Sequence, residues 1–179
     1  YQIDYSKNFK ANHAVILNIS PDHLERHKSI KKYVYAKLKL IKNQTKNDFA
    51  YINNGNKYLK KMINKSKTLS KLIKVEPKII RKFEKKITNP YFLTKGNQEN
   101  LSFIFSIAKK FNLKNENIIQ TINKFKCLKF RQQIIYKSKN ITLINDSKAT
   151  SFSSSIHILK SLQKVFWIVG GIPKIGDKF

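Results

Sequence analysis

Short apolar runs and longer amphipathic stretches alternate along this chain, and their periods predict strands and helices in alternation. Runs rich in Val, Ile and aromatic residues predict strands at residues 13–18, 48–53, 132–136, 141–145 and 165–169. Apolar residues spaced three or four apart predict helices at residues 29–41, 97–111, 115–125 and 151–162. This order predicts an α/β fold, with a mostly parallel sheet and flanking helices.

A change of pattern near residues 125–128 predicts a domain boundary. Before it, strands alternate with helices; after it, two strands follow each other closely and are expected to pair. We therefore expect one domain over residues 1–127 and the beginning of a second over residues 128–179. The chain starts at Tyr1 without a methionine and stops just past a Gly-Gly turn, so we expect it to be a piece of a longer protein.

Composition places the chain among folded proteins. Of its 179 residues 41% are hydrophobic and 12% aromatic, which excludes a disordered chain. No apolar run approaches the roughly 20 residues of a membrane helix, and no signal peptide is visible. Cys127 is the single cysteine, so a disulfide framework or a cysteine metal cluster is excluded. These features predict a cytoplasmic protein with no membrane partner.

The formal net charge of +27 raises the possibility of a nucleic-acid-binding protein. However, Arg26, Arg81 and Arg131 are the only arginines, and specific base readout relies on bidentate arginine. The lysines are also spread along the whole chain. We expect salt-sensitive binding to polyanions, but no specific nucleic-acid partner.

The most informative segment is Asn145-Asp146-Ser147-Lys148-Ala149-Thr150, between a predicted buried strand and a predicted helix. Anionic ligands bind at the carboxyl ends of strands, where the N–H groups of a helix N-terminus favour negative charge. Asp, Ser, Lys and Thr are suitable side chains for such a site. The alternative is an ordinary capped helix start, because Ser and Thr are good N-caps whatever they bind.

A second candidate is His23, which follows the strand predicted to end at Asn18. Ser20-Pro21 predicts a helix start that places Asp22 and His23 on the first helical turn. His23 can serve as a metal ligand or as an orienting group. A purely structural role is the alternative for an isolated histidine.

Lys37 is the candidate partner of His23. On the predicted helix it shares a face with Tyr33, Leu40 and Ile41. A desolvated lysine is a nucleophile, and its reaction with carbon dioxide gives a carbamate whose oxygens can bind Mg²⁺. The alternative is a lysine that extends its ammonium group into water.

Three further positions can contact a ligand. Asn97 and Asn100, one helical turn apart, can bind a nucleobase or cap the helix. Arg131 is isolated among lysines and suits bidentate contact with phosphate. Gly170-Gly171 allows the backbone to approach a ligand closely, with Lys174 available for a carboxylate.

Four segments, in this order, resemble the Mur ligases, the ATP-dependent amide-forming ligases of peptidoglycan precursor synthesis. They are Asn-Ile-Ser-Pro-Asp-His-Leu-Glu-Arg-His, Tyr-Ala-Lys-Leu, the helix start with Asn97 and Asn100, and Ile-Asn-Asp-Ser-Lys-Ala-Thr. The last segment is most similar to that of the members that add D-glutamate. The resemblance covers nearly the whole chain, from the middle of a central ATPase domain into the start of a Rossmann-like C-terminal domain.

The resemblance implies a cytoplasmic, monomeric full-length enzyme that joins D-glutamate to UDP-N-acetylmuramoyl-L-alanine through an acyl phosphate, with ATP and Mg²⁺. It implies catalytic roles for Lys37, carbamylated, and for His23 and Lys148; the first two would hold Mg²⁺. Nucleotide contacts are implied for Asn97, Asn100, Arg131 and Asp146. Contacts with D-glutamate are implied for Lys148, Thr150 and Lys174, and contacts with the muramoyl substrate for Gln2 and His23.

The chain departs from the family pattern at several points. Gly96 stands where a histidine is usual, and Ser151 where an asparagine is common. The five glycines include no phosphate-binding loop of the form G-x-x-x-x-G-K-[ST], so we expect this chain alone to be inactive. The alternatives are another Mur or folylpolyglutamate-type ligase, a lysine-rich nucleic-acid-binding protein, and a remnant without activity.

Overall fold

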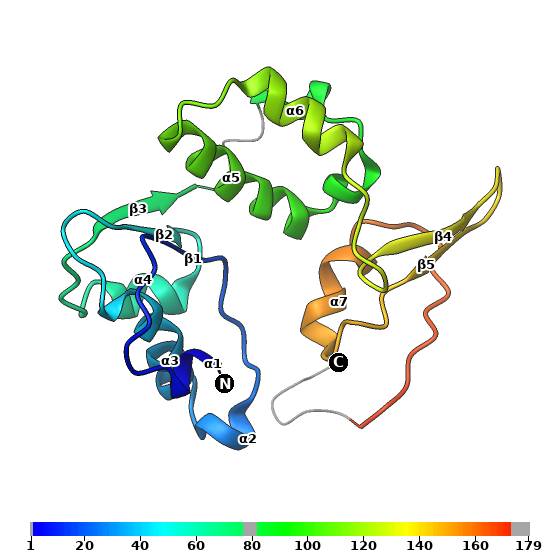
Figure 1. The fold of residues 1–179 in the computed structure, drawn as a ribbon. Helices are drawn as coiled ribbons and strands as arrows, with labels where there is room; N and C mark the ends of the chain where they lie inside the picture. Colours follow the sequence, from blue (N-terminus) through cyan, green and yellow to red (C-terminus); the bar gives the residue numbers. More distant parts are fainter. Residues whose placement is uncertain (1, 77–81, 173–179) are drawn as a thin grey trace. The chain divides into compact units, whose positions relative to one another are not determined.

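The computed structural model describes residues 2–76 and 82–172 of this chain. The chain forms two compact units, residues 1–79 and residues 80–179, called here the N-terminal and C-terminal units. Each unit contains its own cluster of buried apolar side chains. Figure 1 shows the elements of both. Among the described residues, no helix is long and apolar enough to cross a membrane.

The N-terminal unit is an α/β structure built on a three-stranded parallel sheet. Its strands β1, β2 and β3 lie side by side in chain order, with His13 opposite Phe49 and Phe49 opposite Lys71. This confirms the predicted fold class. The elements in order are α1 (Gln2–Tyr5), β1 (His13–Ile16), α2 (Leu24–His27), α3 (Ile30–Lys42), β2 (Phe49–Asn53), α4 (Lys57–Ile63) and β3 (Lys71–Val75).

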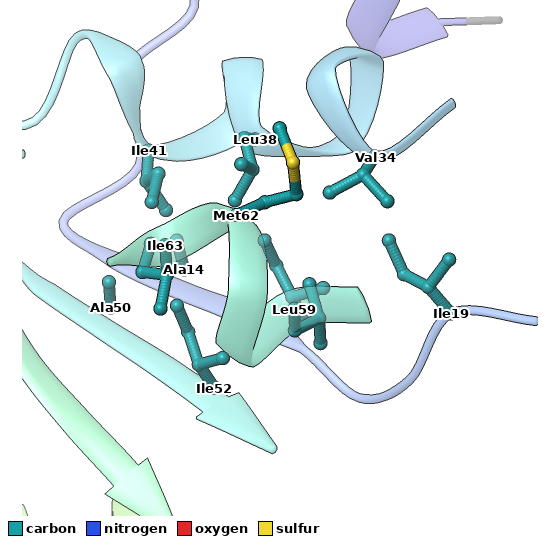
Figure 2. Packing of buried hydrophobic residues seen from close by; sticks show 11 residues of the cluster. Ala14, Ile19, Val34, Leu38, Ile41, Ala50, Ile52, Leu59, Met62 and Ile63 are labelled. Carbon is teal, nitrogen blue, oxygen red and sulfur yellow. The ribbon is translucent and has the colours of Figure 1, made fainter. Parts of the chain in front are cut away.

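The core of this unit lies between one face of the sheet and the helices α3 and α4. Alternate residues of β1 are buried, as expected for a strand with one covered face. Figure 2 shows the apolar side chains of α3 and α4 packed over those of β1 and β2. The buried residues of α3 are spaced four and three apart, which gives the helix one apolar stripe; they are Val34, Leu38 and Ile41.

Side-chain caps determine where the two core helices begin. The Ser29 hydroxyl accepts a hydrogen bond from the backbone N–H of Lys32 and so caps α3. The Asn56 side chain accepts one from the N–H of Leu59 and caps α4. Both caps satisfy N–H groups that have no partner within a helix. The helix predicted over residues 29–41 is therefore confirmed.

A buried carboxylate, Asp48, organises the turn that leads into β2. Its side chain is 1% exposed. It accepts hydrogen bonds from the Thr45 backbone N–H at 2.7 Å, the Thr45 hydroxyl at 2.8 Å and the Asn12 amide at 2.9 Å. Lys10 Nζ lies 3.1 Å from Oδ2 of the same carboxylate. The Thr45 hydrogen bonds and the Lys10 charge hold the pKa of Asp48 well below its usual range.

The C-terminal unit consists of a helical part followed by a β-hairpin and one more helix. The strands β4 and β5 pair antiparallel, which confirms the pairing predicted from the sequence. The elements in order are the 3₁₀ turns η2 (Glu84–Lys86) and η3 (Pro90–Leu93), α5 (Lys95–Lys110), α6 (Asn115–Lys124), β4 (Gln133–Lys137), β5 (Thr142–Asn145) and α7 (Phe152–Leu159).

The helical part has a core of its own between α5 and α6. Leu101 and Phe105 of α5 are buried in the same cluster as Ile118 and Ile122 of α6. The Asn89 amide donates to the carbonyl oxygens of Ile122 and Phe125 at 2.9 and 2.8 Å. These bonds satisfy carbonyls at the end of α6, where the helix offers no partner.

Four predictions about the elements are corrected by the structure. Residues 165–169 form no strand, and Phe166 and Ile168 are 98% exposed, because no strand within the described ranges lies beside them. A strand needs partners for its backbone N–H and C=O groups, and an apolar run alone does not supply them. Strand β5 is largely exposed rather than buried.

The other two corrections concern helix starts and lengths. Helix α2 begins at Leu24, after Asp22 and His23 rather than around them. The backbone of His23 is left-handed (φ 53°), and its N–H is bonded to the Asp22 carboxylate, so the helix cannot extend back to Ser20. Helix α7 ends at Leu159, three residues before its predicted end.

We predict that Asp48→Asn lowers the free energy of unfolding of the N-terminal unit by roughly 1–3 kcal/mol at pH 7, because the amide nitrogen cannot accept the bonds from Thr45. The low pKa of Asp48 stabilises the fold above the unfolded-state pKa of about 3.9, and this contribution disappears as the pH falls towards the folded-state value. The free energy of unfolding of the variant should therefore fall less steeply with decreasing pH below about pH 5. Urea unfolding followed by amide NMR signals of β2 at pH 7 and pH 3 measures both effects.

The exposed carboxylate Glu116 provides the control for this prediction. Glu116→Gln should leave the stability of the N-terminal unit and its acid dependence unchanged. Equal pH dependence in Asp48→Asn and the wild type would contradict the role given to Asp48.

We predict that Leu101→Ala destabilises the C-terminal unit by about 2–5 kcal/mol, because Leu101 is fully buried and its loss leaves a cavity. Ile104 lies on the same helix but is 43% exposed, so Ile104→Ala should cost less than about 1 kcal/mol. Urea unfolding followed by amide NMR signals of α5 compares the two. Similar losses in both variants would argue against the core between α5 and α6.

Candidate functional site

In the N-terminal unit, His23 and Lys37 contact the same tyrosine ring. Tyr33 and Lys37 are one turn apart on α3, and Lys37 Nζ lies 5.5 Å from the centre of the Tyr33 ring. The His23 ring meets the Tyr33 ring edge-on, with 6.2 Å between centroids. The pair predicted from the sequence is thus gathered around one residue, and α3 supplies two of the three side chains.

Two carboxylates flank the imidazole of His23. Its Nε2 lies 3.4 Å from Asp22 Oδ2, and its Nδ1 lies 3.6 Å from Glu25 Oε1. The left-handed backbone at His23 directs this side chain from the loop before α2. Burial, with a smaller effect of the Asp22 charge, raises the pKa of Tyr33, so its phenol stays protonated near neutral pH.

The donor atoms around His23 suit a cation only in part. Mg²⁺ prefers oxygen ligands in octahedral geometry, and Asp22 and Glu25 supply carboxylates beside the imidazole. Yet across residues 2–76 and 82–172 no group of three or more His, Cys, Asp or Glu side chains is arranged to hold a metal. A magnesium site here therefore needs further oxygen ligands, and a carbamate on Lys37 is a chemical source of them.

Gln2, predicted on the muramoyl-substrate side, is the first residue of α1 and is exposed. Its backbone carbonyl accepts a hydrogen bond from the N–H of Ser6. Within the described part of the chain, no side-chain hydrogen bond joins Gln2 to His23 or Lys37.

In the C-terminal unit, a chain of hydrogen bonds joins two of the predicted nucleotide-binding residues, Asn97 and Asp146. Asp146 directly follows β5, and its Oδ1 accepts from the backbone N–H of Gln132 at 3.1 Å. The side-chain Oε1 of Gln132 accepts from Asn97 Nδ2 at 2.8 Å. On the other side of the carboxylate, Ser155 of α7 donates to Asp146 Oδ2 at 3.3 Å. The start of α5, the loop before β4 and the start of α7 are thus held together.

Asn97 does not cap α5, although capping was one of its two expected roles. The cap is Thr94, whose hydroxyl accepts from the Asn97 backbone N–H. The Asn97 amide donates instead to the carbonyl of Tyr91 at 2.6 Å and to Gln132. Both amide hydrogens are therefore used, which fixes the orientation of the amide. Asn100, one turn later, is partly exposed.

Arg131 precedes Gln132 and is exposed. Burial is the main cause that raises the pKa of Tyr91; among smaller effects, the Arg131 charge opposes this shift and the Asp146 charge adds to it. Both charges therefore act at the same tyrosine. That Arg131 and Asp146 contact the same nucleotide stays a prediction.

The loop of residues 145–150 is shaped by local hydrogen bonds and leaves the Lys148 side chain exposed. Asn145 Oδ1 accepts from the Ser147 N–H at 3.0 Å, and the Lys148 N–H donates to the Phe130 carbonyl at 3.0 Å. Thr150 is also exposed. Ser151 is the N-cap residue of α7, but its side chain makes no capping hydrogen bond. The Ser151 hydroxyl therefore does not supply the side-chain cap that an ordinary capped helix start would have.

Lys174 lies outside the described residues. Gly96, where the resembling family usually has a histidine, faces the ring of His157 from α7: a Cβ at residue 96 would lie 3.6 Å from His157 Cδ2.

Sequence reasoning missed Gln132 and Ser155. Gln132 belongs to no motif and has a left-handed backbone (φ 48°), which the sequence does not indicate. Ser155 is one of four serines near the start of α7, and only the fold distinguishes it from the other three.

Comparisons with known proteins all indicate the same family. A family model described as "Mur ligase middle domain" matches residues 2–116. Three similar relatives all carry the name UDP-N-acetylmuramoylalanine–D-glutamate ligase. The protein of Rickettsia prowazekii is 33% identical over 98% of this chain, that of Elusimicrobium minutum 33% over 97%, and that of Prochlorococcus marinus 30% over 100%.

The chain spans 43%, 42% and 41% of the lengths of these three relatives. The family match covers more than half of the residues, and the similar relatives all carry one name. The parallel sheet with flanking helices agrees with this match. The chain belongs to the Mur ligase family.

Proposed function

We propose that this chain is part of an ATP-dependent ligase that adds D-glutamate to UDP-N-acetylmuramoyl-L-alanine in cytoplasmic peptidoglycan precursor synthesis. The observation that carries the proposal is the hydrogen-bonded connection of Asp146 to Asn97 through Gln132, next to the exposed Lys148. The names of the relatives describe the same ligation and support it. The full-length enzyme is proposed to act as a monomer.

The nucleotide side of the site would be formed by Asn97, Asn100, Arg131 and Asp146. A fixed carboxylate such as Asp146 suits ribose hydroxyls, because it accepts charge-assisted hydrogen bonds. Amide side chains suit the edge of a nucleobase, and the exposed guanidinium of Arg131 suits phosphate. In this proposal, the bonds from Gln132 and Ser155 hold Asp146 in place before ATP arrives.

The acceptor side would be formed by Lys148, Thr150 and Lys174, which would bind the carboxylates of D-glutamate. The backbone of Lys148 is anchored to Phe130, while its ammonium group is exposed and available. Lys148 is assigned a catalytic role because a cation there would stabilise charge that gathers where phosphate and carboxylate meet.

In the N-terminal unit, His23 and a carbamylated Lys37 would hold Mg²⁺, and His23 and Gln2 would lie on the muramoyl-substrate side. A bound Mg²⁺ would supply charge neutralisation for the phosphate groups. The residues themselves orient each other: Asp22 and Glu25 flank the imidazole, and the Tyr33 ring lies against both His23 and Lys37.

We further propose that residues 1–127 belong to the central ATP-binding domain and that residues 128–179 begin the amino-acid-binding domain. Two observations support this division. The match to the family's middle domain ends at residue 116, and the antiparallel hairpin β4–β5 begins soon after Cys127.

We predict that Lys37→Ala in the full-length protein lowers the rate of ligation by at least about 100-fold, because the oxygen ligands of the carbamate and their charge stabilisation are lost. The rate is measured as phosphate release with muramoyl substrate, D-glutamate and Mg-ATP. Lys31, an exposed lysine at the start of the same helix, is the matched control, and Lys31→Ala should retain activity within about twofold. An unchanged rate in Lys37→Ala would remove Lys37 from the mechanism.

We predict that Asp146→Asn in the full-length protein weakens ATP binding at least about tenfold, because a neutral amide loses a charge-assisted acceptor while keeping the shape of the side chain. Isothermal titration calorimetry with ATP measures the affinity, and thermal unfolding shows whether the fold persists. The neighbouring Ser147 is exposed, and Ser147→Ala should bind ATP like the wild type. Equal affinities in all three proteins would argue against a nucleotide site at Asp146.

A further inference from the structure

A basic cavity of about 300 Å³ opens on the N-terminal unit. This volume lies near the lower end of the range for small-ligand pockets, about 300–1,000 Å³. None of the residues that line it has a role in the proposed ligase reaction. They come from α1, α2, α3 and the C-cap of α2, and include Asp4, Arg26, His27, Lys28, Lys32 and Lys39.

One carboxylate holds two of the cations in place. Asp4 Oδ2 lies 3.0 Å from Arg26 Nη2, and Asp4 Oδ1 lies 2.6 Å from Lys39 Nζ. The guanidinium of Arg26 also lies over the ring of Tyr5, 4.9 Å from its centre. The hydrogen bonds from Lys39 and Arg26 lower the pKa of Asp4, so the carboxylate stays ionised. Arg26 is therefore fixed at the cavity wall before any ligand binds.

Within residues 2–76 and 82–172, the two remaining lysines have no such partner. Among the described residues, no carboxylate forms an ion pair with Lys28 or Lys32. Both side chains are exposed, Lys28 directly after α2 and Lys32 on the first turn of α3. Like charges gathered around one concave surface repel each other, and an anion in the cavity relieves that repulsion.

His27 does not add to this charge. Its side chain is buried, and burial together with the positive charge of Arg26 lowers its pKa. The imidazole is therefore neutral near pH 7. Four cations and one carboxylate leave the cavity lining with a formal charge of +3.

We propose that this cavity binds a small phosphorylated ligand through a diphosphate group. A diphosphate carries about three negative charges near neutral pH, since a terminal phosphate alone carries roughly 1.5 to 2. Its charge thus matches that of the lining, which holds the fixed Arg26 together with Lys28 and Lys32. Guanidinium binds phosphate oxygens in bidentate fashion, and lysines add point charges. A concave site of this size favours a small ligand over an extended polynucleotide.

The test uses the chain of residues 1–179 and inorganic pyrophosphate, without divalent cations, at 150 mM salt. We expect saturable binding of one pyrophosphate in a calorimetric or NMR titration, with the largest shifts at residues 26–39. The double variant Lys28→Gln, Lys32→Gln should bind at least tenfold more weakly, while inorganic phosphate should bind the wild type more weakly than pyrophosphate does.

The matched control is the double variant Lys60→Gln, Lys61→Gln, which removes two exposed lysines from α4 of the same unit. Its net charge equals that of the Lys28→Gln, Lys32→Gln variant. It should bind pyrophosphate within twofold of the wild type, and thermal unfolding should show all three proteins folded. Equal weakening in both variants, or no saturable binding, would overturn the proposal. A single-stranded oligonucleotide would overturn it as well, if it bound more tightly than pyrophosphate and if both double variants weakened its binding equally. That result would indicate general binding of polyanions. Because this titration needs neither ATP nor turnover, its result is independent of the proposed ligase function.

Discussion

The packing of α3 onto β1 and β2 is the constraint on which the chemistry of the N-terminal unit depends. Val34, Leu38 and Ile41 form the buried stripe of this helix, so the rotation of α3 about its axis is fixed by the core. With about 100° per residue, Tyr33 and Lys37 then lie roughly 60–100° to one side of Val34. Lys32 and Lys39 lie roughly 140–160° to the other side.

One helix therefore presents two chemically different flanks. The flank with Tyr33 and Lys37 meets the loop that carries His23. The opposite flank meets α1, whose Asp4 pairs with Lys39. A slip of α3 against the sheet would displace both groups at once. The cap at Ser29, which fixes where the helix starts, therefore contributes to the position of side chains two and three turns further along.

In the C-terminal unit, polar contacts rather than apolar burial define the candidate site. The hairpin β4–β5 is largely exposed, and the apolar core lies between α5 and α6. The position of Asp146 depends instead on Gln132 and Ser155. Gln132 adopts a left-handed backbone, a conformation that costs about 1–2 kcal/mol for a residue other than glycine. The hydrogen bonds that Gln132 makes to Asn97 and Asp146 offset this cost. The strained backbone of Gln132 is therefore part of the arrangement that positions Asp146.

The spacing of apolar residues was enough to predict two kinds of element. They are strands whose pairing partner is close in the chain and helices whose buried apolar stripe spans several turns. The stripe of α3 and the alternation in β1 indicate their buried faces directly, and the spacing of Tyr33 and Lys37 indicates their contact. Residues 165–169 show the limit, because an apolar run specifies a strand only together with neighbours that pair with its backbone. The left-handed residues His23 and Gln132 show another limit, since side-chain patterns carry little information about positive φ outside glycine and asparagine.

The high net charge of the chain makes local arrangement more important for selectivity, not less. Exposed charges farther apart than about 8 Å are largely screened at physiological ionic strength, so lysines scattered over the surface attract all anions weakly. Selective binding requires cations that converge within that distance and are held in place. Arginine suits this role because its planar guanidinium can pair with a carboxylate and lie over a ring at the same time. Arg26 does both, with Asp4 and Tyr5. Nearly all basic residues of this chain are lysines. A guanidinium that is held in place therefore distinguishes a specific anion-binding site from the overall positive charge of the surface.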